Sequence, residues 1–270
     1  MSGLRESLKT GLPAPLVNVL RESRDALNRA SQWPSATFHP WRRDSVQRLA
    51  ALKDRHKGQR CFLIGNGPSL KQTNLSHLKD EYTLGQNRIF MAFPEWGFST
   101  SYFLSVNDLV VEQSAQEIQS LSMPCFVAWR ARKWLKPQDN LFFIHTTYTG
   151  EKFARDIRER VWEGGTVTYT SLQAAYFLGF SQVILVGVDH NYVTPGKPNA
   201  TVVSQGDDPN HFDPNYFGKG FRWQLPDLVQ WEEAYRLARR TYEADGREVL
   251  DATVGGKLTV FPKVDYNSLF

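Results

Sequence analysis

The segment from residue 61 to residue 71, CFLIGNGPSLK, runs from an apolar stretch straight into two glycines, an asparagine and a serine. The apolar stretch is typical of a buried strand, so Gly65, Asn66, Gly67 and Ser69 would lie where that strand ends. Glycine lets backbone N–H groups come close to a phosphate, and the Asn and Ser side chains add uncharged hydrogen-bonding groups. The spacing is neither GxGxxG nor a Walker loop, because Pro-Ser follows the second glycine. The segment indicates a phosphate- or nucleotide-binding turn, with a plain tight turn as the alternative.

Polar residues follow other strand-like runs in the same way. They are Asn87 after YTLGQ, Asn107 and Asp108 after SYFLSV, and Asp189, His190, Asn191 and Tyr192 after QVILVGV. One asparagine at such a place is easily a turn former. The carboxyl ends of parallel strands share one edge of a sheet, however, so four such groups predict a ligand site in a single crevice.

From residue 60 onward the chain alternates strand-like and helical patterns. Strands are predicted at 60–65, 82–87, 101–106, 124–129, 140–145, 182–187 and 247–252, and helices at 109–121, 168–180 and 228–246. This rhythm implies crossover connections, so we predict a Rossmann-like α/β fold with a mostly parallel sheet and helices on both faces. Residues 1–59 are predicted to be a helical extension and residues 60–270 a nucleotide-binding domain. Its long polar segment 190–227 is either a lid or disordered.

The composition, 41% hydrophobic and 22% charged over 270 residues, is that of a globular protein. There is no run of about 18 apolar residues that could cross a membrane, and the first residues lack the apolar core of a secretory signal. Cys61 and Cys125 lie in apolar runs, which predicts buried thiols rather than a disulfide or a metal site. We therefore expect a protein of the reducing cytoplasm.

The positive charge is concentrated near the N-terminus. Residues 1–60 carry 12 Lys and Arg against 5 Asp and Glu, a net +7, and the remaining residues, with 20 against 23, carry −3. Apolar and basic residues fall near helical spacing there: Leu16, Val19, Leu20 and Leu27 with Arg21, Arg24 and Arg29. This arm fits a basic amphipathic helix on an anionic membrane, although we favour an ordinary helix packed outside the crevice. No nucleic-acid-binding module accompanies the charge, so nucleic acid is not an expected partner.

The motifs also resemble known families. The IGNGPSL turn, Asn87, Asn107 and the GVD strand end together resemble the small bacterial sialyltransferases that use CMP-sialic acid. They are similar as well to the broader 6-hydroxymethylpterin diphosphokinase MptE-like family, which includes flagellin-modifying and other sugar transferases besides true diphosphokinases. The match runs in motif order over roughly residues 60–251. It implies a Rossmann-like transferase domain whose nucleotide site lacks a metal-binding DxD motif.

The resemblance implies roles for individual residues. Cytidine- and sugar-binding roles carry over to Asn66, Gly67, Ser69, Asn87 and Asn107, and we group Gly65 and Asp189 with them because they lie at the same strand ends. In the resembled transferases a lid supplies tyrosines for the leaving phosphate and a histidine as general base. The lid here, DDPNHFDPNYFGKGFRW at 207–223, places Tyr216 at a tyrosine position but Lys219 at the base position. The resemblance therefore leaves the base open.

Sugar transfer needs a group that takes the proton of the acceptor hydroxyl, and histidine is the usual choice near neutral pH. We consider His211 in the lid first, His190 at the strand end second, and Lys219 by alignment. The charge of the leaving phosphate needs a positive or hydrogen-bonding partner. We expect that partner among Lys219, Arg222, Tyr192 and Tyr216.

The lid offers two further readings. Its aromatic residues, Tyr216, Phe217, Phe221 and Trp223, either pin the loop or form a platform for the acceptor. Asp207, Asp208, His211 and Asp213 could suit Mg²⁺ or Mn²⁺, but their spacing matches no metal motif and DDPN suits a turn. We therefore predict no metal site.

Three hypotheses follow. The first is an inverting, metal-independent glycosyltransferase that moves an acidic sugar from a CMP donor to a glycan or other surface acceptor, with no cofactor beyond its donor substrate. The second is a diphosphokinase that uses ATP and Mg²⁺ on a pterin. The third is a non-catalytic nucleotide-binding protein. The expected partner is a nucleotide-activated small molecule, and the basic arm adds peripheral contact with the inner face of the membrane as an alternative to a purely cytoplasmic location.

Overall fold

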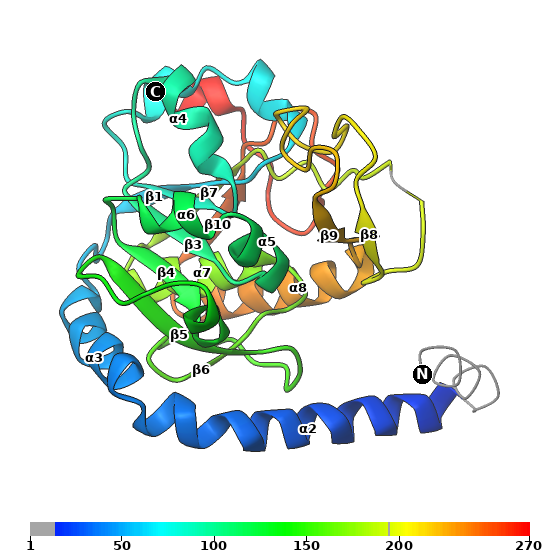
Figure 1. The fold of residues 1–270 in the computed structure, drawn as a ribbon. Helices are drawn as coiled ribbons and strands as arrows, with labels where there is room; N and C mark the ends of the chain where they lie inside the picture. The colour runs from blue at the N-terminus through cyan, green and yellow to red at the C-terminus, as the bar shows by residue number, and fades with distance from the viewer. Residues whose placement is uncertain (1–13, 194) are drawn as a thin grey trace.

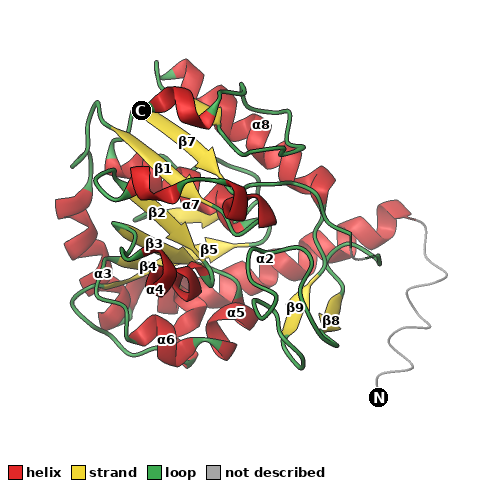
Figure 2. Cartoon of the chain, turned by 90° about the horizontal axis from the view of Figure 1, so that it is seen from above, coloured by secondary structure: helices red, strands yellow, loops and turns green. Residues whose placement is uncertain are grey.

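The computed structural model describes residues 14–193 and 195–270. In the first helix the backbone is described from residue 14, but the side chains of residues 14–18, 21, 22 and 25 are not. The predicted roles of the Leu16 and Arg21 side chains in an amphipathic helix therefore fall outside the described part. Figure 1 shows the order of the elements and Figure 2 the same chain from above.

An eight-stranded sheet forms the centre of the molecule. Its spatial order is β10 (Glu248–Asp251), β7 (Gln182–Val186), β1 (Arg60–Ile64), β2 (Thr83–Gln86), β3 (Tyr102–Ser105), β4 (Cys125–Ala128), β5 (Leu141–Thr147) and β6 (Arg160–Trp162). Every pairing in it is parallel. The predicted Rossmann-like α/β fold is confirmed. The short β6 was not predicted, because three residues carry too little pattern.

The strand order reverses beside β1. From β1 the chain moves outward through β2 to β6, and it then returns to add β7 and β10 on the other side of β1. In open parallel sheets such a switch point leaves a crevice beyond the carboxyl ends of the two central strands. That crevice lies where the GNGPS turn leaves β1.

Helices complete the fold. The α-helices are α2 (Ala14–Phe38), α3 (Pro40–Leu49), α4 (Phe93–Trp96), α5 (Asp108–Gln113), α6 (Ala115–Gln119), α7 (Val167–Leu178) and α8 (Leu228–Ala244). The 3-10 helices are η1 (Ala50–Leu52), η2 (Pro68–Gln72), η3 (Leu75–Leu78), η4 (Ile89–Ala92), η5 (Trp129–Lys133) and η6 (Tyr266–Leu269). The helix predicted at 109–121 is divided into α5 and α6 at Ser114, which leaves the helical region with φ −128°. Among the helices of the described residues, none combines the length and the apolar character that a bilayer-spanning segment needs.

The strands bury both faces. Cys61 and Leu63 of β1 belong to the core shared with α7 and α8, whereas Phe62 and Ile64 belong to the core on the opposite face. Strands of a parallel sheet read as continuous apolar runs for this reason. The same property made β1 recognisable in the sequence.

Helix α3 packs on the sheet, although it falls in the predicted N-terminal extension. The first half of β5 pairs with β4 on one side only, and α3 covers its other side. There the backbone N–H of Phe143 donates to Ser45 Oγ at 3.0 Å, and Arg48 donates to the carbonyl of Leu141 at 2.9 Å. These bonds satisfy backbone groups that an open strand edge would leave unpaired.

The predicted lid segment, 190–227 without residue 194, folds over the carboxyl end of the sheet as irregular chain with one short antiparallel pair, β8 (Thr201–Val203) and β9 (Arg222–Gln224). A backbone bond from the N–H of Phe212 to the carbonyl of Asn66, 2.9 Å, joins it to the glycine turn. The lid and the glycine turn therefore lie side by side at the crevice beyond β1.

Candidate functional site

A cavity of about 750 Å³ opens beyond the carboxyl ends of the strands. This volume is in the usual range for a small-molecule site. Of the predicted site residues, the following line it: Gly65, Asn66, Gly67, Asn87, Asn107, Asp189, His190, Tyr192 and His211. The structure thus gathers residues from four strand ends and the lid around one space.

The two glycines allow the turns after β1 and β7 to touch. A Cβ atom at Gly67 would lie 1.8 Å from Oδ2 of Asp189, and one at Gly65 would lie 2.3 Å from the carbonyl oxygen of Gly187. Ser69 binds the same Asp189 carboxylate through its N–H, at 3.1 Å, and its hydroxyl, at 2.7 Å. Ser69 therefore positions Asp189 and does not itself line the cavity.

No α-helix follows the glycine turn directly. The residues after the turn make η2, a five-residue 3-10 helix, and its Ser69 N–H is taken by Asp189. The Asp189 carboxylate thus takes the N–H and hydroxyl of Ser69, and these two donors are not available to a phosphate. Burial raises the pKa of Asp189 above its ordinary value, against the lowering effect of the two Ser69 hydrogen bonds.

Asn66 has an unused acceptor at the cavity. Its amide nitrogen donates to the carbonyl of Gln86 at 3.1 Å, while its Oδ1 is buried and has no hydrogen-bond partner within the described residues. A buried polar atom without a partner is costly, so this oxygen is ready to accept from a ligand donor such as an exocyclic amine or a ribose hydroxyl.

The side chains of Asn87 and Asn107, the other two predicted site asparagines, also make hydrogen bonds within the protein. Asn87 adopts φ +55°, a left-handed conformation that Asn tolerates better than most residues, and its Oδ1 accepts from Ser105 at 3.1 Å. The Oδ1 of Asn107 caps α5 by accepting from the N–H groups of Leu109 and Val110, at 3.0 and 3.3 Å. Each amide is thereby fixed in direction at the cavity wall.

His211 forms a dyad with Asp208. Its Nδ1 lies 2.7 Å from the Oδ2 of Asp208, whose side chain is buried. Facing a carboxylate acceptor, Nδ1 is the nitrogen suited to donate, which leaves Nε2 as the nitrogen that can accept a proton. The imidazole also stacks on Tyr216, with ring centroids 4.0 Å apart. An imidazole oriented in this way at a cavity wall can act as a general base.

His190 is placed less favourably. Its Nε2 lies 3.3 Å from Oε1 of Glu232, its Nδ1 is buried without a partner among the described residues, and its backbone has φ +54°. The half-buried Tyr192 contacts both His211 and Trp231 through its ring. Desolvation raises the pKa of Tyr192, so its hydroxyl stays protonated and can donate to a ligand.

The cationic residues predicted from the lid do not reach the cavity. Lys219 is exposed to solvent, and Arg222 is exposed and paired with Glu112 at 2.8 Å. Tyr216 is fully buried, and its hydroxyl accepts from the backbone N–H of Arg88 at 3.2 Å. Lid folding turns the two cations outward, because its aromatic residues fill the inner side; of these, Phe217 and Trp223 line the cavity.

Helix α2 supplies a cation instead. Arg24 and Asn28 line the cavity, and Arg24 is the one Lys or Arg that the described residues contribute to its wall. Arg29 donates to the hydroxyl of Thr149 and so ties α2 to the loop after β5. The expectation that the N-terminal helices lie outside the crevice is therefore wrong for α2, whereas α3 contributes no residue to the cavity lining. Helical spacing in the sequence does not reveal which face of a helix turns toward the domain.

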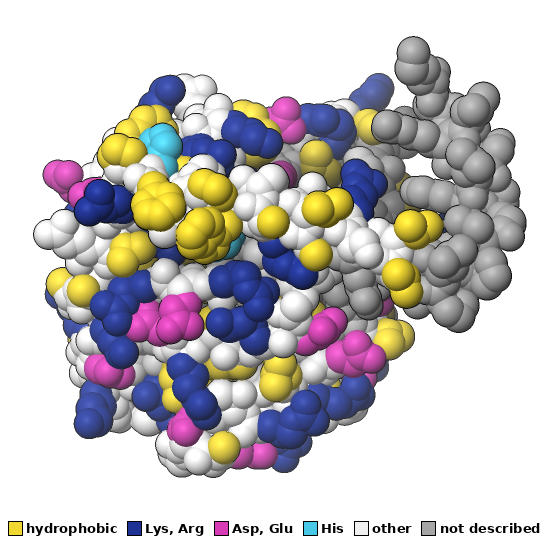
Figure 3. All heavy atoms as spheres, turned by 90° about the horizontal axis from the view of Figure 1, so that it is seen from below, with side chains coloured by type: hydrophobic (Ala, Val, Ile, Leu, Met, Phe, Trp, Pro, Cys, Tyr) yellow, Lys and Arg dark blue, Asp and Glu magenta, His cyan; other side chains and the backbone are white. Residues whose placement is uncertain are grey.

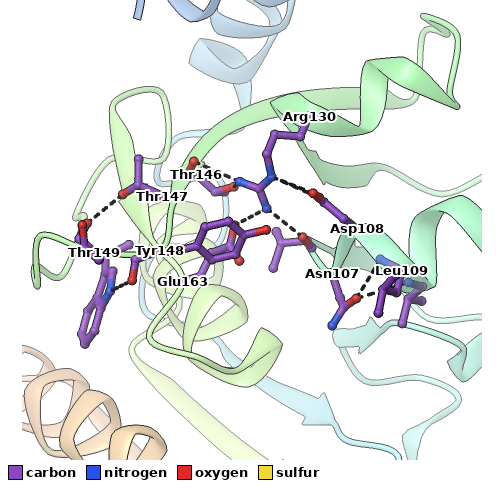
Figure 4. A network of polar contacts seen from close by, with 12 residues as sticks. Asn107, Asp108, Leu109, Arg130, Thr146, Thr147, Tyr148, Thr149 and Glu163 are labelled. Atoms are coloured by element: carbon purple, nitrogen blue, oxygen red, sulfur yellow. Dashed lines mark hydrogen bonds and ion pairs between the residues drawn. The ribbon is translucent and has the colours of Figure 1, made fainter. Parts of the chain in front are cut away.

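A buried ionic network, which sequence reasoning missed, holds the far side of the cavity (Figure 4). Arg130 donates to Glu163 at 2.7 Å and to Asp108 at 3.1 Å, and also to the carbonyl and the hydroxyl of Thr146 at 3.2 and 3.0 Å. Its guanidinium lies 4.5 Å from the centre of the Tyr148 ring. The network joins the ends of β3, β4, β5 and β6. In the sequence, the one feature that indicates this network is Arg130, which comes directly after the apolar strand predicted at 124–129.

The carboxylates of Asp108 and Glu163 share this single guanidinium, and both residues line the cavity. Burial raises the pKa of Glu163, while Arg130 opposes the rise. Within the described part of the chain, no group of three His, Cys, Asp or Glu residues could hold a metal ion. The carboxylates of Asp108, Asp189 and Asp208 at or behind the wall are each bound to protein donors.

Comparisons with known proteins agree on the fold. The family model for 6-hydroxymethylpterin diphosphokinase MptE-like proteins matches residues 41–195, and a search of curated proteins found no match. Among solved structures, the chain is similar to the MAf glycosyltransferase from Magnetospirillum magneticum AMB-1, with a TM-score of 0.51 and 15% sequence identity. The similarity covers 84% of this chain and 39% of that one, so the chain spans about two fifths of that transferase.

Proposed function

The chain belongs to the 6-hydroxymethylpterin diphosphokinase MptE-like family, and from this membership we propose that it is a nucleotide-dependent transferase. We propose further that it is an inverting glycosyltransferase that moves an acidic sugar from a CMP donor to a glycan or other surface acceptor. The observation that carries this proposal is the His211–Asp208 dyad in the wall of a cavity at the switch point of the sheet. A general base is what transfer to a hydroxyl needs.

In the proposed reaction, Nε2 of His211 takes the proton of the acceptor hydroxyl as its oxygen attacks the anomeric carbon. The bond from that carbon to the donor phosphate breaks on the opposite face, and CMP leaves with the bonding electrons. A single displacement of this kind inverts the anomeric centre. The imidazolium formed is stabilised by Asp208, which lies 2.7 Å from its Nδ1.

The donor is held by neutral groups and one cation in this proposal. The free acceptor of Asn66 is suited to the exocyclic amine of cytosine or to a ribose hydroxyl. Arg24 and the protonated hydroxyl of Tyr192 are the groups that stabilise the charge on the leaving phosphate. The carboxylates of Asp108 and Glu163 are bound to Arg130 and that of Asp189 is bound to Ser69, so these three lining residues do not suit a resident divalent cation. The proposed reaction is therefore metal-independent.

The family name favours a second candidate, pyrophosphate transfer from ATP to a pterin. That reaction would need Mg²⁺ to screen the phosphates. It predicts tight ATP binding only with Mg²⁺, whereas the glycosyltransferase proposal predicts CMP and CDP binding that Mg²⁺ does not alter. A protein that binds nucleotide but turns over neither substrate class would be a binding protein.

Calorimetric titration with CMP, CDP, ATP and GTP, each with and without Mg²⁺, tests these alternatives directly. Where CMP binds, the release of CMP from CMP-activated acidic sugars follows, with the anomeric configuration of the product read by NMR. Binding of CMP without Mg²⁺ and an inverted product are the expected results. Retention of configuration, or a preference for ATP with Mg²⁺ over CMP, would overturn the proposal.

A further inference from the structure

Helix α2 turns a polar face toward the rest of the protein. Arg24 and Asn28 line the cavity, Arg29 is bonded to the loop after β5, and Ser35 accepts a hydrogen bond of 3.1 Å from the indole of Trp129. Each of these contacts is polar, and of the described side chains of α2 only the small Ala36 joins a hydrophobic core. A surface helix of a globular protein usually does the reverse and packs its apolar stripe on the core.

The apolar residues of α2 lie on the solvent side instead. The exposed large hydrophobic residues of this helix are Val19, Leu20, Leu27, Trp33 and Phe38. Leu20, Leu27 and Phe38 follow one another at 7 and 11 residues, which is about two and three helical turns, so they share one side. Seen from below, Figure 3 shows hydrophobic side chains in a row across the face that α2 crosses, with Lys and Arg side chains on both sides of the row.

This apolar row, Leu20, Leu27 and Phe38, calls for a partner, since large apolar side chains in contact with water are unfavourable. Its aromatic end is distinctive: the rings of Trp33 and Phe38 contact each other edge to face, with centroids 5.7 Å apart, and both side chains are exposed. Indole and phenyl groups next to cations are the side chains that anchor helices at a bilayer interface.

We propose that the outward face of α2 docks on an anionic membrane surface. Lys and Arg side chains border the apolar row on this face (Figure 3), and residues 1–60 as a whole carry a net +7; both features complement anionic headgroups. The apolar row would enter the headgroup region while the flanking Lys and Arg side chains meet lipid phosphates. The same helix carries Arg24 to the cavity wall, so docking would set the cavity beside the membrane surface.

A second copy of the chain is a poorer occupant. Two such arms in contact would bring together like charges. A paired helix also needs apolar residues repeating every 3.5 positions, and the series that starts at Leu20 and Leu27 continues at Pro34, with Ser23, Arg24, Ala30 and Ser31 at the intermediate positions. The apolar row therefore lacks the seam of a coiled coil.

Cosedimentation of the full chain with vesicles tests this proposal. The vesicles are phosphatidylcholine alone, or phosphatidylcholine with phosphatidylglycerol. We expect binding to the anionic vesicles, weaker binding to the neutral ones, and a loss of about tenfold in partition for Leu27→Glu. Leu27 is 71% exposed, so the change does not disturb the core. Val229→Glu is the matched control, because Val229 of α8 is 72% exposed and lies outside the apolar row; it should bind as the wild type does.

The proposal is overturned if the wild type binds neither vesicle, or if Leu27→Glu and Val229→Glu bind alike. It is also overturned if sedimentation equilibrium without lipid shows a dimer that Leu27→Glu dissociates, because a second copy would then be the occupant. None of these measurements depends on turnover, so they stand whether or not the glycosyltransferase proposal does.

Discussion

The Nδ1 of His211 lies 2.7 Å from the Oδ2 of Asp208, and that carboxylate is itself held in place by backbone donors. The N–H of Asn210 donates to its Oδ1 at 2.9 Å, and the N–H of Phe217 donates to its Oδ2 at 3.2 Å. Backbone groups of Asn210 and Phe217, on either side of His211 in the chain, therefore hold the Asp208 carboxylate in place. The carboxylate in turn orients the imidazole of His211. A base whose orientation is set before substrate binds loses little entropy on reaching the transition state.

His211→Ala should lower turnover by about 10²–10⁴-fold while leaving CMP affinity near that of the wild type, because a general base acts in the transition state and not in donor binding. Initial rates of CMP release and calorimetry provide the two readouts. His77→Ala is the control, since His77 is exposed and is not among the residues that line the cavity. Equal rates for both variants would remove His211 from the mechanism and leave His190 as the next candidate.

Arg24→Ala should weaken CMP binding by about tenfold or more, because one charge-assisted contact to a phosphate is lost. The structure predicts this although the helical spacing of the N-terminal arm predicted no role in the crevice. Arg43→Ala removes an exposed arginine of α3 that does not line the cavity, and should leave affinity unchanged. An unaltered dissociation constant for Arg24→Ala would mean that another group binds the phosphate.

Gly67→Ala should destabilise the fold by about 1–3 kcal/mol, as overpacking does, because the new Cβ would lie 1.8 Å from an Asp189 oxygen that Ser69 holds in place. Gly206→Ala is matched to it, since a Cβ there meets nothing within 4 Å. Urea unfolding followed by circular dichroism measures both. If the two variants unfold at the same midpoint, the turns after β1 and β7 are not in the tight contact described.

Arg130→Met should cost about 3–5 kcal/mol of stability, because it leaves the partly buried Asp108 and the buried Glu163 without their counter-charge. Arg222→Met breaks an exposed pair with Glu112 and should cost no more than about 1 kcal/mol. The comparison uses the same substitution at a buried and at an exposed arginine. Similar unfolding free energies for the two would show that the network contributes no more than a surface pair.

Acid should destabilise the protein through His145. Burial, with Arg42, Arg160 and Arg130 nearby, lowers the pKa of His145 from 6.5 to about 4. Between those values the unfolded chain binds a proton that the folded protein does not, so the free energy of unfolding falls as the pH falls from 6.5 toward 4. The slope attributable to one such proton is at most about 1.4 kcal/mol per pH unit.

His145→Gln should therefore flatten the stability profile over that pH window, whereas His77→Gln, at an exposed position, should leave it unchanged. Unfolding free energies measured at several pH values give the slopes. An equally steep decline in His145→Gln would assign the acid sensitivity to other groups.

Most of the sheet could be predicted from the sequence because the signals were local. Residues 61–64 and 183–186 are continuous apolar runs, as strands buried on both faces must be. The glycines and polar residues directly after them marked the carboxyl ends of those strands, and parallel topology then brought the ends together. Three-residue strands such as β6 and β9 carry no such signal, so they were missed.

The sequence by itself thus determined the α/β class, the family motif and the edge of the sheet at which the site lies. Only the tertiary structure decided which charges face the cavity. Lys219 and Arg222 were expected there from their place in the lid, but the lid turns them to solvent, and Arg24 reaches the wall from a helix far away in the sequence. The partner of His211 was decided in the same way. Strand and glycine patterns are set by neighbours along the chain, whereas the direction of a lid or of a helix face is set by packing between segments that the order of residues does not reveal.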